Sequence, residues 1–165
     1  MDNWSKEESL KFLKDKIEVI RTAMLTTYNN DTGFHSRPMG TADVDSEENI
    51  WFFTSDFSAK ANEVEVRHAV SLTYADISNH TYLSIKGEAS LIDDKAKMKE
   101  LWNPFVKAFF PKGLEDPKLI LIKVKVTDAE YWDSSSSSMV ILFNVLKAVV
   151  TGKQYHEGAH GKIDL

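Results

Sequence analysis

The first twenty residues carry the polar and apolar pattern of an amphipathic helix. Apolar side chains recur there at helical spacing, at Leu10, Leu13, Ile17 and Ile20. Ser5 followed by Glu8 makes a capping box, in which each side chain satisfies a backbone N–H at the helix start. The pattern predicts a helix that begins after Ser5, continues to about residue 20 and packs through one face.

After residue 21 the chain alternates between extended stretches and polar turns. The expected strands are residues 23–28, 34–44, 50–54, 68–76, 82–92 and 119–132. Turn-forming Asn, Asp, Ser and Gly residues join the first two strands and the fourth and fifth, which predicts two hairpins. In the fifth strand the apolar face comprises Leu83, Ile85, Gly87, Ala89 and Leu91. This period of two is typical of a half-buried antiparallel strand.

Three further helices are expected. Ser58 caps a short one that continues to about residue 67, and residues 140–150 place apolar side chains at helical spacing. Asp93 and Asp94 open the third, which Pro104 kinks or restarts. Its apolar stripe consists of Met98, Leu101, Trp102, Phe105 and Phe109. The helical period of its aromatic residues, Trp102, Phe105 and Phe109, favours core or interface packing over a cofactor pocket.

The order of these elements indicates the fold class. Hairpin-connected strands without βαβ alternation favour a mainly β (α+β) fold, an antiparallel sheet or barrel with peripheral helices, over a Rossmann fold. At 165 residues the chain is expected to form one domain, residues 1–153. Residues 154–165 are polar and are expected to form a loosely held tail.

Composition narrows the partners. A net charge of -5 disfavours broad attraction to nucleic acid or to an anionic membrane surface, so any anion must be held locally. The chain has no cysteine, which excludes disulfides and thiolate chemistry and fits a reducing compartment. Neither a signal peptide nor a membrane-spanning apolar run is evident. We therefore expect a cytoplasmic protein.

A candidate anion site lies where the 50–54 strand turns into the expected short helix. Hydroxyls of Thr54, Ser55 and Ser58, the free N–H groups of the helix start and the Lys60 ammonium converge on one point if the segment folds this way. A phosphate needs such donors. The alternative interpretation is a Ser-capped helix with an exposed lysine.

A second candidate lies in the 34–44 strand, at Arg37, Pro38 and Met39. Proline gives up a ladder hydrogen bond, so this strand is an edge, a barrel rim or a ligand-facing position there. Arg37 offers a planar fork that binds phosphate with two hydrogen bonds. The alternative is a surface arginine on an edge strand.

Taken in order, these segments resemble a known family. Arg-Pro-Met, then Trp-Phe-Phe-Thr-Ser-x-x-Ser-x-Lys, then Glu-Tyr-Trp late in the last long strand are similar to the pyridoxamine 5'-phosphate oxidase-like FMN-binding split barrels, general stress protein 26-like subfamily. The resemblance implies an antiparallel split β-barrel and a homodimer with FMN in two interface clefts. It implies that Arg37, Thr54, Ser58 and Lys60 hold the FMN phosphate, and Ser55 is a plausible addition.

The same resemblance implies contacts to the flavin ring. The backbone around Pro38 and Met39, and Phe53, are expected beside the isoalloxazine, and Trp132 is expected to reach it from the partner subunit. The alternative for Trp132 is interface packing. Where the oxidase proper has further basic residues this chain has Ala42 and Ala59, and serines replace its Arg-x-His substrate motif. These departures argue against authentic pyridoxamine 5'-phosphate oxidation.

Two functions from different classes remain. The first is an FMN-dependent oxidoreductase that acts on a small molecule, with an electron donor such as NAD(P)H. The second is a non-catalytic flavin-binding or stress-associated protein that sequesters the cofactor. A phosphorylated tail alone does not distinguish FMN from FAD, a deazaflavin or haem.

A zinc-protease pattern near the C-terminus is treated as fortuitous. His156-Glu157-Gly158-Ala159-His160 matches H-E-x-x-H, which needs a helix to bring both imidazoles to one face. Gly158 and Gly161 disfavour that helix. No metal site is expected.

Overall fold

The computed structural model describes residues 5–55, 68–133 and 159–163. The strands in these ranges are β1 (Thr22–Asn29), β2 (Gly33–Val44), β3 (Asn49–Thr54), β4 (His68–Asp76), β5 (Thr81–Ile92), β6 (Ile120–Asp133) and β7 (Ala159–Ile163). The helices are α1 (Lys6–Ile20), α3 (Lys95–Leu101), α4 (Pro104–Phe109) and the short 3-10 helix η1 (Gly113–Glu115). The expected helices near residues 58–67 and 140–150 lie outside the described residues, as does the serine run.

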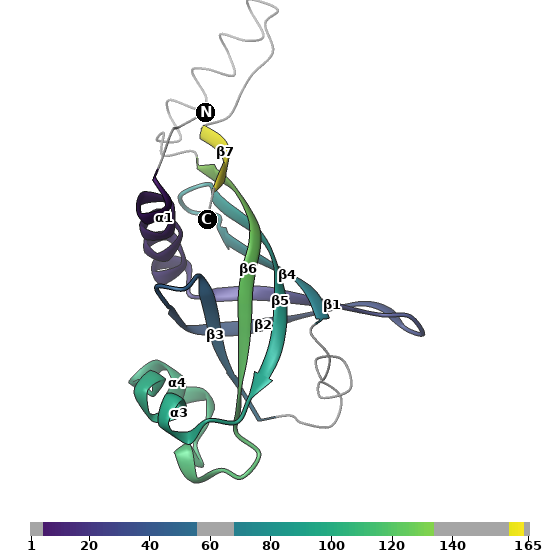
Figure 1. Ribbon diagram of the computed structural model, residues 1–165, viewed down its shortest axis with the longest axis vertical. Helices are drawn as coiled ribbons and strands as arrows, with labels where there is room; N and C mark the ends of the chain where they lie inside the picture. The colour runs from purple at the N-terminus through teal and green to yellow at the C-terminus, as the bar shows by residue number, and fades with distance from the viewer. Residues whose placement is uncertain (1–4, 56–67, 134–158, 164–165) are drawn as a thin grey trace, which may run out of the picture.

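Six of these strands close into an antiparallel barrel. The strand order is β3-β2-β1-β4-β5-β6, and β3 also pairs with β6, which closes the ring (Figure 1). Strand β6 is long enough to pair with β5 along one edge while its other edge is shared by β3 and β7. The mainly β, split-barrel expectation is confirmed.

The barrel interior forms the main core. Its largest fully buried side chains include Leu25, Phe52, Leu72, Tyr74, Leu83 and Ile85. Helix α1 adds Leu13 and Ile17 to this core. The Ser5 and Glu8 capping box is present, with the Glu8 carboxylate accepting from the Ser5 N–H at 2.8 Å. The sequence prediction of this helix is confirmed.

A second core lies outside the barrel, between β3 and the helices α3 and α4. Trp51 and Phe53 point into it, whereas Phe52 points into the barrel. Because both faces of β3 are covered, the whole strand is buried, which explains its continuous apolar sequence. Asn103 caps α4 and Pro104 begins it, so the proline separates two helices as expected.

The C-terminal segment corrects one expectation. Residues 159–163 form β7, which pairs with the end of β6, and Ile163 is buried in the main core. This part of the expected loose tail is therefore held by the sheet. His160 lies on this strand and not on a helix, while His156 lies outside the described residues. Within the described ranges, no helix combines the length and apolarity needed to cross a membrane.

Candidate functional site

A cavity of about 400 Å³ lies between the outer face of the β1–β2 hairpin, the end of β3 and helix α4. We call it the β2–α4 cavity. Its lining residues are Thr22, Pro38, Met39, Gly40, Phe53, Thr54, Ser55, Phe105, Val106, Phe109 and Phe110. The structure thus brings together Pro38, Met39, Phe53, Thr54 and Ser55, which the sequence assigned to one site.

The cavity exists because β2 and α4 approach each other closely at Gly40. A Cβ atom at this position would lie 2.8 Å from the Phe105 ring, so any side chain here would displace that ring. The absence of a side chain lets Phe105 close one end of the cavity. Thr54 and Ser55 line it where β3 ends.

The walls are mainly apolar and include four phenylalanine rings. Phe53 meets Trp102 edge to face, with ring centroids 5.5 Å apart, and Phe105 meets Phe109 at 5.2 Å. Thr22, Thr54 and Ser55 are the polar residues of the lining. No lining residue in the described ranges is an acid, a base or a thiol. The arrangement suits a flat apolar ring with a polar extension.

Arg37 lies on the other face of β2 from Pro38. Its cross-strand partner is Leu25, a core residue, and its Nη2 donates to the Thr27 hydroxyl at 3.2 Å. It does not line the β2–α4 cavity. Ser58 and Lys60 lie outside the described residues, so the meeting of Arg37 with that turn stays a prediction.

Trp132 is far from the cavity along the chain's own barrel. Thr54 pairs with Ile120 at the start of β6, and Trp132 follows twelve positions later. At roughly 3.3 Å per residue the two lie about 40 Å apart along the strand. Trp132 stacks instead on His160, with centroids 4.9 Å apart and rings 9° from parallel.

The α4 side of the cavity was missed by sequence reasoning. The sequence interpretation of the aromatic stripe as core or interface packing fits Trp102, which packs against the second core. Phe105 and Phe109 belong to a separate helix and line the cavity, and Phe109 is 63% exposed. The signal was Pro104, because a restarted helix gives its side chains a new direction.

Comparisons with known proteins agree with this architecture. The sequence model of a family described as pyridoxamine 5'-phosphate oxidase like matches residues 8–156. A solved structure described as the general stress FMN/FAD binding protein of Xanthomonas citri is 31% identical, with a TM-score of 0.67, over 81% of this chain and 93% of that one.

Two more distant relatives extend the comparison. A candidate general stress protein 26 from Jannaschia sp. CCS1 is 22% identical, with a TM-score of 0.72, over 92% of this chain and 94% of that one. At this identity the likeness supports the split-barrel fold alone. Protein bli-3 of Neurospora crassa is 28% identical over 141 residues, which make up 79% of this chain and 68% of that protein.

Proposed function

Because the chain belongs to the pyridoxamine 5'-phosphate oxidase-like family, we propose that it binds FMN in the β2–α4 cavity and acts as an FMN-dependent oxidoreductase on a small molecule. The observation that carries this proposal is the convergence of Pro38, Met39, Phe53, Thr54 and Ser55 on one aromatic cavity. The relative from Xanthomonas citri, described as FMN/FAD binding, supports a flavin. We place the protein in the cytoplasm as part of the same proposal, because a chain without cysteine suits a reducing compartment.

The described residues fit a flavin. At about 400 Å³ the cavity lies within the range of cofactor sites, roughly 300–1,000 Å³. Pro38, Met39 and Phe53 would hold the ring and exclude water from it, and the Thr54 and Ser55 hydroxyls would bind the polar extension. A bound flavin supplies the redox chemistry, and the protein supplies orientation and a shaped cleft.

Anchoring of the terminal phosphate distinguishes FMN from other flavins. We expect Arg37, Ser58 and Lys60 to bind it together with Thr54 and Ser55. Riboflavin, which lacks the phosphate, should then bind roughly 10- to 100-fold more weakly than FMN, since charge-assisted hydrogen bonds contribute about 1.5–3 kcal/mol. Fluorescence titration of flavin-free protein with FMN, FAD and riboflavin measures this. Equal affinity for riboflavin and FMN would show that these residues do not bind the phosphate.

Turnover separates the two functional classes. Serines stand where the oxidase has its Arg-x-His substrate motif, which favours a non-catalytic flavin-binding protein as the second candidate. Stopped-flow mixing of the FMN-loaded protein with NADH and NADPH, followed by an electron acceptor, decides between them. Repeated reduction and reoxidation of the flavin supports the oxidoreductase, and tight binding without any reduction supports the alternative.

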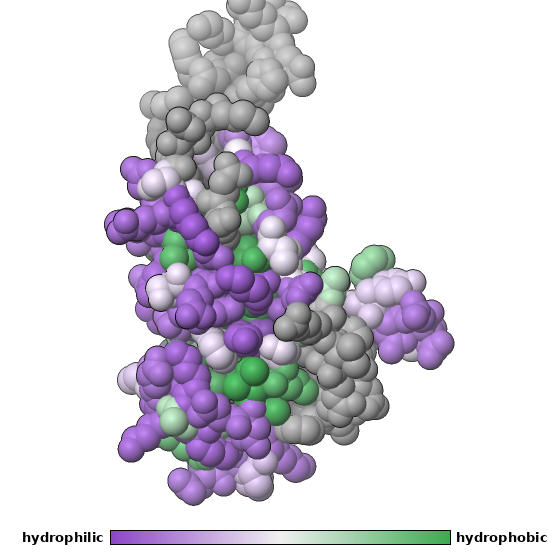
Figure 2. Space-filling view, viewed as in Figure 1, coloured by the Kyte–Doolittle hydropathy of each residue, from purple (hydrophilic) through white to green (hydrophobic). Residues whose placement is uncertain are grey.

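We also propose a homodimer, supported by an exposed apolar surface on the β1–β2 hairpin. Met24, Tyr28 and Phe34 are 42%, 53% and 77% exposed on it, and the Tyr28 and Phe34 rings lie 4.9 Å apart. The hairpin extends well away from the barrel; its tip is mainly hydrophilic, with a hydrophobic patch on one side (Figure 2). Trp132, about 40 Å along the strand from its own Thr54, would reach a flavin only from a second copy.

The substitution Phe34→Asp should convert the dimer to a monomer, because it places a charge in the proposed apolar interface. Light scattering after size exclusion should give about twice 18.7 kDa for the unaltered chain and the monomer mass of 18.7 kDa for the variant. His35→Asp is the matched control, since its exposed side chain lies on the opposite face of the hairpin. A Phe34→Asp protein that stays dimeric at micromolar concentration would place the interface elsewhere.

A further inference from the structure

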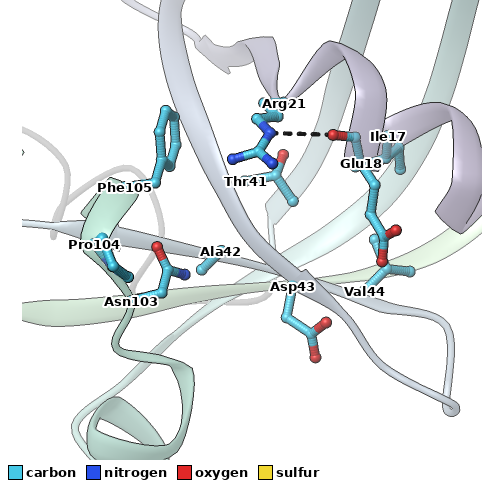
Figure 3. A pocket seen from close by; sticks show the side chains of 10 residues that line it. All are labelled: Ile17, Glu18, Arg21, Thr41, Ala42, Asp43, Val44, Asn103, Pro104 and Phe105. Carbon is cyan, nitrogen blue, oxygen red and sulfur yellow. Dashed lines mark hydrogen bonds between the residues drawn. The ribbon is translucent and has the colours of Figure 1, made fainter. Parts of the chain in front are cut away.

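A second cavity adjoins the β2–α4 cavity and shares Phe105 as a wall. We call it the α1–β2 cavity, because it lies between the end of α1, the end of β2 and the start of α4 (Figure 3). Its volume is about 490 Å³. Its apolar lining comprises Ile17, Ala42, Val44, Pro104 and Phe105, and its polar lining comprises Glu18, Arg21, Thr41, Asp43 and Asn103.

Arg21 occupies this cavity with a strained backbone. Its φ of 65° and ψ of -32° lie in a region that L-residues seldom adopt and that glycine adopts at little cost. Two hydrogen bonds hold the residue there: its N–H donates to the Ile17 carbonyl at 2.8 Å, and its carbonyl accepts from the Thr41 N–H at 2.7 Å. Strain of this kind is common at functional sites.

The Arg21 guanidinium has hydrogen-bond capacity to spare. Its Nε donates to the Glu18 carbonyl at 3.2 Å, and the group lies 5.7 Å from the centre of the Phe105 ring. Among the described residues no carboxylate lies within ion-pair distance of it; Asp43 instead faces Lys14 at 3.6 Å. The Glu18 carboxylate points away from the guanidinium, toward Val44 (Figure 3). The Nη donors therefore face the cavity.

The charges around the cavity limit the anion that it accepts. Arg21 is the cation of the lining, whereas Glu18 and Asp43 are acidic. A polyphosphate would be repelled by both acidic side chains. A single carboxylate can accept two parallel hydrogen bonds from the planar guanidinium. Ala42, Pro104 and Phe105 form an apolar surface beside the Arg21 guanidinium. The lining thus suits a compact monoanion with an apolar body.

We propose that the α1–β2 cavity binds a small monocarboxylate, with the carboxylate on the Arg21 guanidinium and the apolar body against Phe105 and Ala42. This site goes beyond the proposed flavin function and does not depend on it. Because Phe105 separates the two cavities, the ligand would lie one aromatic ring away from the proposed flavin site. Only one further step rests on the proposed function, namely that the small carboxylic acid bound here is a substrate of the flavin reaction.

The test uses benzoate and its neutral isostere benzamide as probes, with the full chain free of flavin. In NMR titrations, benzoate should give saturable shifts of the Arg21 Nε–H and of the Thr41 and Ala42 amides. Benzamide should bind at least tenfold more weakly, because it cannot form the ion pair. Equal affinities for the two probes, or no saturable shift at millimolar benzoate, would overturn the proposal. A failed flavin titration leaves this result unaffected.

Variants at position 21 separate binding from folding. Arg21→Gly should weaken benzoate at least tenfold while the melting temperature does not fall, because glycine relieves the backbone strain. Arg21→Gln keeps the backbone strain and most of the aliphatic part of the side chain but removes the charge. It should weaken benzoate to the same extent, and it provides the test if the glycine variant does not fold. Lys11→Gln removes a charge from the exposed face of the same helix and should leave benzoate affinity unchanged. Unchanged benzoate affinity in both position 21 variants would contradict the site.

Discussion

Replacing Gly40 with leucine is expected to lower FMN affinity at least 100-fold, roughly 2.7 kcal/mol, while the barrel stays folded. A Cβ atom at this position already meets the Phe105 ring at 2.8 Å, so leucine must push the ring and fill the β2–α4 cavity itself. The group that the new side chain meets is the Phe105 ring, which lies outside the barrel and can move. The cavity is therefore lost at a smaller cost in stability than a substitution inside the barrel would carry.

The matched control for Gly40→Leu is Glu88→Leu. Glu88 is exposed on β5 and does not line the β2–α4 cavity, so the control adds the same apolar side chain elsewhere on the barrel. Fluorescence titration with FMN gives the affinities, and circular dichroism confirms that both variants are folded. A Gly40→Leu protein that binds FMN within threefold of the unaltered chain would show that the flavin lies outside this cavity.

Gly87→Val is expected to have the largest effect on stability. Gly87 faces the core at a bulge between β5 and β6, and a Cβ atom there would lie 2.6 Å from the Lys125 carbonyl oxygen and 2.6 Å from a Val124 methyl. Because one of these atoms belongs to the backbone of a central strand, rotamer changes alone cannot relieve the contact. Overpacking of this kind costs about 3 kcal/mol or more.

Thermal unfolding measures the Gly87 effect. A loss of about 3 kcal/mol lowers the melting temperature of a chain of this size by roughly 6–12 °C. Gly87→Ala should fall between the unaltered chain and Gly87→Val, and Glu88→Val, at the neighbouring exposed position, should be close to neutral. A Gly87→Val protein as stable as the Glu88→Val control would contradict the packing described at this bulge.

Local patterns predicted most of the barrel. The period of two in residues 82–92 placed Leu83, Ile85, Gly87 and Ala89 on one face, and all four are buried in β5. The capping box and the apolar stripe of α1 were equally reliable, because both depend on residues within one or two turns. The closure of β3 onto β6 joins segments about seventy residues apart, and no local pattern specifies it.

The two halves of the β2–α4 cavity differ in how far the sequence predicted them. The β2 and β3 side follows from proline chemistry and from the end of a buried strand, and the family resemblance added Phe53. The α4 side contributes Phe105 and Phe109, whose place depends on the direction in which Pro104 restarts the helix. That direction is set by packing against Trp51 and Phe53, which the local sequence does not encode.

Arg37 illustrates a further limit. Adjacent residues of a strand point to opposite faces, so the side chains of Arg37 and Pro38 contact different surfaces of β2. The sequence analysis assigns Arg37 and Pro38 to one cofactor without accounting for their opposite faces. An anchoring role for Arg37 requires the flavin phosphate to lie at the rim of the barrel, past the end of β3, where the two faces meet.

The most direct measurement of where the flavin binds is a crystal structure of the full chain grown with FMN. We expect electron density for the ring in the β2–α4 cavity, against Pro38, Met39 and Phe53, with the phosphate beyond Thr54 and Ser55. Density for the ring on any other surface, with this cavity closed by Phe105 and Phe109, would contradict the proposed function.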